Sequence, residues 1–181
     1  MFQLRPSRRL ARIHRRPLNP WWFNSDGSGR FDLEPEQGTC YLAEEPLGAF
    51  VEAFRDPRVV HASTVADRAL ATLRVPTRLR FADCTVGEAR RFGNTLGIGA
   101  SDDYELCRRW AQALAGEGFA GIRYRLRHDP SGSLVGIAFF GAAGEADWPV
   151  EASGPIPDHL IRKAEDRFGI VVVPGVIRPP S

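Results

Sequence analysis

The sequence predicts a single α+β domain, with a compact mixed β-sheet core and flanking helices. Its 181 residues are enough for one well-buried domain and few for two. Strand-like and helix-like segments are interspersed, without the regular strand–helix–strand alternation of a parallel sheet. A hydrophobic share of 43% is ordinary for a globular chain. We expect one domain over residues 1–181, with its core at about 11–173, a basic N-terminal arm at 1–10 and a Pro-rich tail at 174–181.

Strands are predicted where apolar residues alternate with polar ones or form short buried runs. The expected strands are 11–15, 39–43, 78–82, 121–125, 134–140 and 170–173. The turn formers at 128–132 predict an antiparallel hairpin with a longer loop around them. The stretch 66–85 otherwise gives mixed signals, and the chain is expected to loosen after Gly141.

Helices are predicted where apolar residues recur at three- to four-residue spacing. One begins at Pro46, which suits a first helical turn because its missing N–H costs nothing there, and its apolar face runs to Phe54. A second covers about 101–116, with Ser101 as the expected N-cap. A third covers about 157–168.

Composition argues against several classes of function. No stretch approaches the ~20 apolar residues of a membrane helix, so no membrane partner is expected. The net charge of +2 is too small to predict direct nucleic-acid binding. Three scattered cysteines form no disulfide framework and favour the cytoplasm. The four histidines lack metal-ligand spacing, and the glycine-rich run 93–99 lacks the Lys-Ser/Thr ending of a phosphate loop.

Three residues between Ser28 and Phe54 are candidates for a binding site. Arg30 lies beside glycines, and its guanidinium fork matches phosphate oxygens. Tyr41 lies on a predicted strand, where its ring can stack on a flat heterocycle. Glu52 lies within an apolar helix, where a carboxylate can stabilise a cationic sugar-like transition state. Pattern alone favours ordinary roles: a solvated arginine, a core aromatic and the polar side of an amphipathic helix.

The order of these motifs resembles the RES domain family. The residues that carry the resemblance are Ser28-Gly29-Arg30-Phe31-Asp32, Thr39-Cys40-Tyr41-Leu42-Ala43 and Ala49-Phe50-Val51-Glu52, with Ala11-Arg12-Ile13-His14 upstream and the segments 109–114 and 118–125 downstream. The match spans about residues 11–141. Several motifs in the right order are more specific than any one of them.

The resemblance implies a fold related to ADP-ribosyltransferase toxins and an enzyme that cleaves NAD⁺ at the nicotinamide–ribose bond. Phosphate is the acceptor in characterised members, and water is the alternative. NAD⁺ would be the substrate, with no separate cofactor. By position, Arg12 and Arg30 would hold the NAD⁺ phosphates, Tyr41 would pack near the nicotinamide, and Glu52 would stabilise the oxocarbenium-like ribose.

The resemblance also implies a partner, because many family members are toxins blocked by a helix-turn-helix antitoxin.

One position departs from the family pattern: Leu126 stands where a Ser is usual, and its side chain forms no hydrogen bond. Ser131 and Ser133 are close in sequence but belong to the next loop. The departure motivates a second hypothesis, a catalytically degenerate module that binds a nucleotide or protein partner without turnover. A third hypothesis, nucleic-acid binding through the N-terminal arginines, predicts steep salt dependence. The sequence leaves open the subunit number, a homo-oligomer included.

Overall fold

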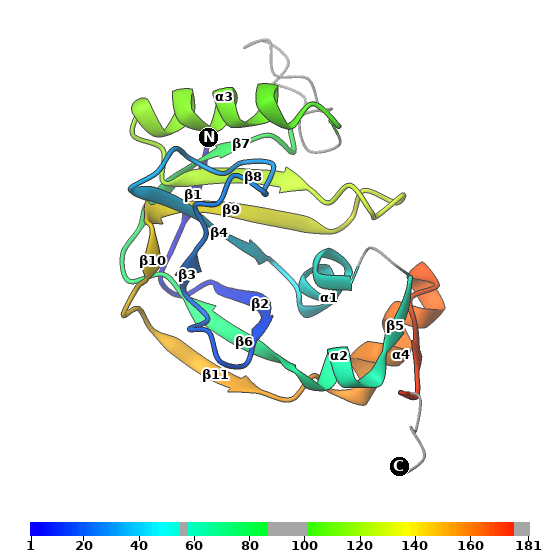
Figure 1. Ribbon diagram of the computed structural model, residues 1–181. Coiled ribbons are helices and arrows are strands. Elements are labelled where there is room, and N and C mark those ends of the chain that lie inside the picture. Colours follow the sequence, from blue (N-terminus) through cyan, green and yellow to red (C-terminus); the bar gives the residue numbers. More distant parts are fainter. Residues whose placement is uncertain (55–57, 87–100, 176–181) are drawn as a thin grey trace.

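The computed structural model describes residues 1–54, 58–86 and 101–175. The strands of its large sheet are β1 (Phe2–Leu4), β2 (Arg9–Arg15), β4 (Gln37–Ala43), β6 (Arg68–Arg74), β7 (Leu79–Asp83), β8 (Gly121–Arg125), β9 (Val135–Ala142) and β11 (Val150–Gly154). They run in the order β1-β7-β8-β9-β4-β2-β6-β11 (Figure 1), and β7 and β8 are the parallel neighbours among these described strands. The predicted α+β class with a mixed sheet is confirmed.

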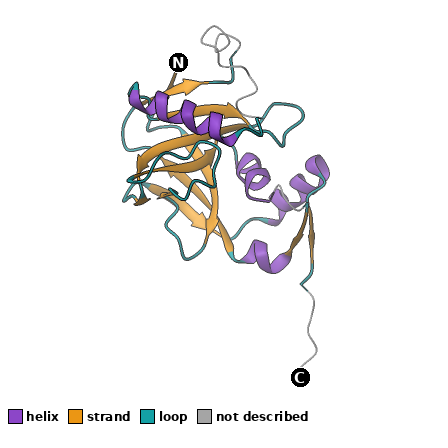
Figure 2. Cartoon of the chain, turned by 45° about the horizontal axis from the view of Figure 1, so that its top comes forward, coloured by secondary structure: helices purple, strands orange, loops and turns teal. Residues whose placement is uncertain are grey.

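Two small sheets and four helices complete the described fold. The small sheets pair β3 (Trp22–Phe23) with β10 (Gly144–Glu145), and β5 (Val59–His61) with β12 (Val171–Val173). The helices are α1 (Pro46–Phe54), α2 (Ala62–Ala66), α3 (Tyr104–Gly116) and α4 (Asp158–Phe168). The helices α1, α2 and α4 gather on one side of the strands (Figure 2), whereas α3 lies apart from them, near β7 and β8 (Figure 1).

The large sheet is split in its middle, between β4 and β2. β4 pairs with β9 over its whole length, and β2 pairs with β6 over its whole length. In contrast, β4 and β2 meet at one described residue pair, Ala11 with Ala43. Beyond that pair the two strands diverge (Figure 1), so side chains from both can line one space between the two halves.

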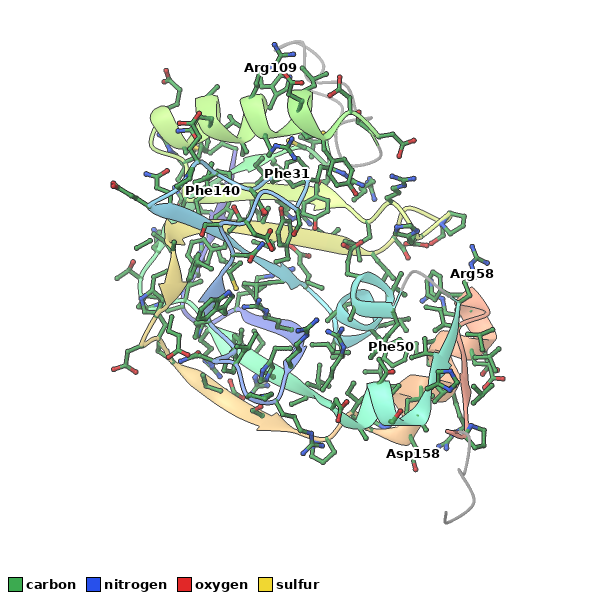
Figure 3. The ribbon with its side chains drawn as sticks, viewed as in Figure 1. Phe31, Phe50, Arg58, Arg109, Phe140 and Asp158 are labelled. Carbon is green, nitrogen blue, oxygen red and sulfur yellow. The ribbon has the colours of Figure 1, made fainter. Side chains whose placement is uncertain are left out.

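Two apolar clusters form the core. One combines α1 and α4 with β2, β4, β8 and β9, and its buried members include Phe31, Phe50 and Leu126. Phe31 lies beside α3, and Phe50 is a residue of α1 (Figure 3). The other cluster contains Trp21 and Phe23 together with Phe81 and Phe139. The segment that holds Trp21 and Phe23 is therefore a structural anchor, because burying large rings contributes strongly to folding.

The N-terminal expectation was wrong. Residues 1–10 do not form an arm outside the core: Phe2–Leu4 is an edge strand that pairs with β7, and Leu4 is fully buried. Two more strands of the large sheet were missed, β6 within the mixed-signal stretch and β11 within the region expected to loosen. The short strands β3, β5 and β10 and the short helix α2 were not predicted either. The N-cap of α3 is Asp103, whose side chain accepts the backbone N–H of Leu106, and not Ser101.

The remaining boundaries agree with the expectations to within a few residues. The predicted hairpin is present as β8 and β9, paired antiparallel. The glycine-rich run 93–99 and most of the Pro-rich tail lie outside the described residues. Among the described helices, none has the length and apolar character needed to cross a membrane.

Candidate functional site

A cavity of about 270 Å³ opens at the split of the sheet. It is lined by Arg12, Ile13, Asn24, Ser28, Gly29, Arg30, Phe31, Tyr41, Leu42, Ala49, Glu52, Ala53, Arg68, Tyr104, Tyr124 and His128. The four residues singled out in the sequence, Arg12, Arg30, Tyr41 and Glu52, all belong to this lining. They come from β2, a turn, β4 and α1, so the fold brings together residues up to 40 positions apart in the chain.

Arg30 is presented by a tight turn that a buried carboxylate organises. Asp32, 1% exposed, accepts the backbone N–H of Gly29 at 2.8 Å and the hydroxyl of Tyr41 at 2.8 Å. The Tyr41 oxygen in turn accepts the N–H of Phe31 at 2.8 Å. Both residues next to Arg30 are therefore fixed by hydrogen bonds to buried groups, which restricts where the Arg30 side chain can go.

Position 29 has no room for a side chain, so this turn requires glycine there. A Cβ there would lie 2.3 Å from the Asp32 Oδ1 and 2.4 Å from the Tyr41 hydroxyl, closer than atoms approach without something shifting. The glycine before the arginine therefore allows the carboxylate and the phenol to approach the backbone. This gives a physical reason for the order Gly29-Arg30-Phe31-Asp32.

The Tyr41 hydroxyl has a positioning role in this arrangement. It donates to Asp32 and accepts from Phe31, so both of its main hydrogen-bonding capacities are used. Burial, and then the Asp32 carboxylate, raise the pKa of Tyr41 well above its usual value, so the phenol stays protonated. Its ring, rather than its hydroxyl, is what Tyr41 offers to the cavity.

Arg12 is also fixed before any ligand arrives. Its Nη1 lies 2.6 Å from the Pro20 carbonyl oxygen, 2.9 Å from the Trp22 carbonyl oxygen and 2.8 Å from the Cys40 Sγ. Burial raises the pKa of the Cys40 thiol to about 11, although the Arg12 charge opposes this, so the sulfur is neutral. These contacts hold the guanidinium across the split between β2 and β4.

Glu52 comes from α1, which begins at Pro46 and lies against β2 and α4. Leu47, Phe50, Val51 and Phe54 are buried, as their spacing predicts, while Glu52 and Ala53 are half-buried at the cavity. Among the described residues of the lining, Glu52 is the one carboxylate, against three guanidiniums from Arg12, Arg30 and Arg68. The cavity therefore carries net positive charge and suits an anionic ligand.

Several lining residues were not singled out from the sequence. Tyr104, the first residue of α3, stacks under Arg30, whose Cζ is 5.4 Å from the ring centroid. His128 and Arg68 line the cavity from the β8–β9 loop and from β6. Tyr104 and Arg68 lie outside the motifs quoted from the sequence, and His128 follows the segment 118–125 in a loop whose turn formers do not indicate what the loop approaches. Asp32 had a usable signal, since an Asp after glycine in a turn commonly accepts backbone N–H groups.

The loop that carries His128 is built around a second buried carboxylate. Asp129, 5% exposed, accepts the backbone N–H of Leu134 at 2.6 Å and both the N–H and hydroxyl of Ser131. It also accepts the Ser133 hydroxyl at 3.0 Å. Burial alone would raise the pKa of Asp129, but these hydrogen bonds outweigh it and hold the pKa at about 2. His128 is thus carried by a rigid loop.

Leu126 does not line the cavity. It is 2% exposed and packs against the backbone at Gly48 and Gly136, where an added Cβ would lie 3.1 Å and 2.6 Å from its methyl groups. Its neighbours two positions away, Tyr124 and His128, do reach the cavity. At the position where the family pattern has Ser, this chain has a core packing residue. Within the described residues, no cluster of His, Cys, Asp and Glu side chains is arranged to hold a metal ion.

Comparison with known proteins gives one family and one informative structure. The model of the RES domain matches residues 9–158. A chain in the crystal structure of the M. tuberculosis MbcT–MbcA toxin–antitoxin complex is similar, with a TM-score of 0.67 and 18% identity over 89% of this chain and 90% of that chain. No curated protein matches. The motifs quoted from the sequence all fall within the matched segment, and the chain belongs to the RES domain family.

Proposed function

We propose that this RES domain cleaves the nicotinamide–ribose bond of NAD⁺ and transfers the ADP-ribosyl group to phosphate or water. The observation that supports this most directly is the cavity at the split of the sheet, with its three guanidiniums, one carboxylate and several aromatic rings. A dinucleotide carries a diphosphate, a flat cationic ring and a ribose. Each has a complementary group in this lining.

Arg12 and Arg30 would bind the diphosphate. Both guanidiniums are already held in place, Arg12 by carbonyl oxygens and Arg30 by its turn and the Tyr104 ring. Groups oriented before the ligand arrives cost little reorganisation when it binds. The ring of Tyr41 would pack against the nicotinamide. At about 270 Å³ the cavity is at the small end for ligand sites, which fits the reacting half of the dinucleotide better than the whole.

Glu52 would stabilise the reacting ribose. As the bond between ribose C1′ and the nicotinamide nitrogen breaks, its electron pair leaves with nicotinamide and positive charge develops on the ribose. A half-buried carboxylate interacts with this charge more strongly than one in open water. A phosphate or water oxygen then bonds to C1′. The products are nicotinamide and ADP-ribose 1″-phosphate, or nicotinamide, ADP-ribose and a proton.

We further propose that the chain is the toxin of a toxin–antitoxin pair and acts in the cytoplasm. Similarity to a chain of the MbcT–MbcA toxin–antitoxin complex supports the toxin role. A helix-turn-helix antitoxin would be the partner, and coverage of the cavity would be sufficient to inhibit cleavage. The three cysteines are buried without disulfide bonds, in keeping with a reducing compartment.

One observation favours a second candidate function, binding without turnover. Leu126 occupies the position of the family Ser and is buried in the core, so this position offers the cavity no hydroxyl. If the reaction needs that hydroxyl, the domain would hold NAD⁺ or a protein partner without cleaving it.

The decisive experiment incubates the purified protein with NAD⁺ and phosphate and follows nicotinamide release. Glu52→Gln keeps the shape of the side chain but removes its charge, so we expect at least a 100-fold lower rate with unchanged folding. Glu45→Gln is the matched control, because Glu45 is exposed just before α1 and outside the cavity lining. Its rate should equal that of the wild type.

Three outcomes separate the candidates. Nicotinamide release that depends on Glu52 supports the enzyme, and ³¹P NMR of the products then identifies the acceptor. NAD⁺ binding without release supports the module without turnover. Release at the same rate in Glu52→Gln would remove this carboxylate from the mechanism.

A further inference from the structure

A second hollow adjoins the cavity, with a volume of about 480 Å³. Its lining residues are Arg15, Arg16, Pro17, Thr64, Asp67 and Arg68. Arg68 lines both spaces, so the hollow continues the cavity past the end of β2. Nothing in the proposed cleavage of NAD⁺ uses Arg15 or Arg16.

Two arginines of this hollow face each other, and no described carboxylate forms an ion pair with either of them. Arg15 and Arg68 are directly opposite in the antiparallel pair of β2 and β6. Burial, and then the charge of Arg15, lower the pKa of Arg68. Among the described residues, no carboxylate lies within ion-pair distance of Arg15, Arg16 or Arg68. The carboxylate of Asp67, although it lines the same hollow, forms no ion pair with them.

Arg68 is nevertheless held in a defined place. Its Cζ lies 5.5 Å from the centroid of the Phe54 ring on α1, two residues beyond Glu52 in the chain. Like charges opposite each other on neighbouring strands are destabilising, so an anion bound between them would relieve an existing repulsion. An arginine fork also matches phosphate oxygens better than it matches most other anions.

Position along β2 indicates which phosphate would bind there. Arg15 lies three residues beyond Arg12 on β2, about 10 Å along the strand, and the two side chains point to opposite faces of the sheet. Arg68, which lines both spaces, therefore connects the cavity to the hollow. If Arg12 and Arg30 bind the diphosphate, the two charges of that group are already matched. A further phosphate one ribose away would reach the neighbourhood of Arg68 and Arg15.

We infer that the hollow formed by Arg15, Arg16 and Arg68 binds a phosphate monoester on the adenosine ribose, so that the protein accepts NADP⁺ as well as NAD⁺. The inference rests on the proposed function for the direction in which the dinucleotide lies. A phosphate monoester carries between one and two negative charges at neutral pH, enough to engage several guanidiniums. Arginine is also the residue that accommodates the 2′-phosphate in other dinucleotide sites.

Binding of two small probes tests the hollow without requiring catalysis. Calorimetry at 150 mM salt would compare adenosine 2′,5′-bisphosphate with AMP, which lacks the 2′-phosphate. We expect the wild type to bind the bisphosphate at least 10-fold more tightly. The double variant Arg15→Gln/Arg16→Gln should lose this preference and keep its affinity for AMP. Arg5→Gln/Arg78→Gln is the control, because it removes the same charge from exposed positions outside the hollow.

The binding results test the phosphate hollow separately from the proposed cleavage of NAD⁺. Equal affinity of the wild type for both probes, or an unchanged preference in Arg15→Gln/Arg16→Gln, overturns the inference even if NAD⁺ is cleaved. A preference that disappears in that variant supports it even if no nicotinamide is released. If the variant instead raises only the KM for inorganic phosphate during NAD⁺ cleavage, the hollow serves the acceptor and the inference is wrong.

Discussion

Two turns line the same cavity, and each is organised by a buried aspartate. In residues 28–32, Asp32 holds the backbone on both sides of Arg30. In residues 126–134, Asp129 holds the loop that carries His128. The partners differ: Asp32 reaches Tyr41 on β4, whereas the partners of Asp129 lie two to five residues away. The first turn is thus tied to the sheet, and the second is a self-contained loop.

This difference predicts different consequences when either carboxylate is removed. Loss of Asp32 would leave the Tyr41 hydroxyl and the Gly29 N–H without their acceptor inside the protein. Loss of Asp129 would leave one buried donor, the Leu134 N–H, without its acceptor, but its other partners, Ser131 and Ser133, are exposed and their hydroxyls can turn towards water. Leaving a buried donor without an acceptor costs more than leaving an exposed one.

The largest effect is expected from Asp32→Ala. We expect the free energy of unfolding to fall by about 4 kcal/mol, because more than one buried donor loses its acceptor. Denaturant unfolding would measure it. The control is Asp26→Ala, since Asp26 accepts hydrogen bonds from Asn24 and Ser28 at an exposed position, and it should cost less than about 1 kcal/mol. Similar losses in both variants would contradict the special role of Asp32.

Gly29→Ala tests whether close packing, as well as hydrogen bonding, fixes the conformation of the first turn. The new methyl group would contact Asp32 and Tyr41, and we expect a loss of about 3 kcal/mol by thermal or denaturant unfolding. Gly154→Ala is the matched substitution, because nothing lies within 4 Å of a Cβ at that position. It should change stability by less than about 0.5 kcal/mol. An unaffected Gly29→Ala protein would show that the turn can rearrange.

Asp129→Asn gives a smaller effect that depends on pH. The pKa of Asp129 is held at about 2, below its usual value, so its charge stabilises the fold above pH 4 and this contribution is lost as the pH falls from about 4 towards 2. The shift corresponds to about 2 kcal/mol. Unfolding measured at pH 7 and pH 3 should show the variant less stable at pH 7 and the difference narrowed at pH 3. A difference independent of pH would assign the loss to packing.

The sequence predicted the first turn better than the second for a physical reason. Arg30, Tyr41 and Glu52 lie in motifs whose order is specific, and β4 and α1 form where their apolar patterns indicate. These residues line one cavity because the sheet is split between β2 and β4. Local sequence patterns do not predict that split. His128 lies in a segment whose turn formers predict a loop and say nothing about what the loop approaches.

Local sequence features also explain why three strands of the large sheet were not predicted. β6 reads Arg-Ala-Leu-Ala-Thr-Leu-Arg, and alanine, leucine and arginine favour helices, so local preference opposed the strand that tertiary pairing enforces. β11 is mostly exposed and lacks the alternating apolar face that marks a strand. β1 has three residues, too few for any period to be visible.

The proposed cleavage of NAD⁺ requires one bound geometry, which a crystal structure of the Glu52→Gln protein soaked with NAD⁺ would show directly. We predict the diphosphate within hydrogen-bond distance of Arg12 and Arg30, the nicotinamide ring against Tyr41, and the ribose C1′ facing the residue 52 side chain. Density for NAD⁺ at any other surface, with the cavity at the split of the sheet empty, would contradict the account.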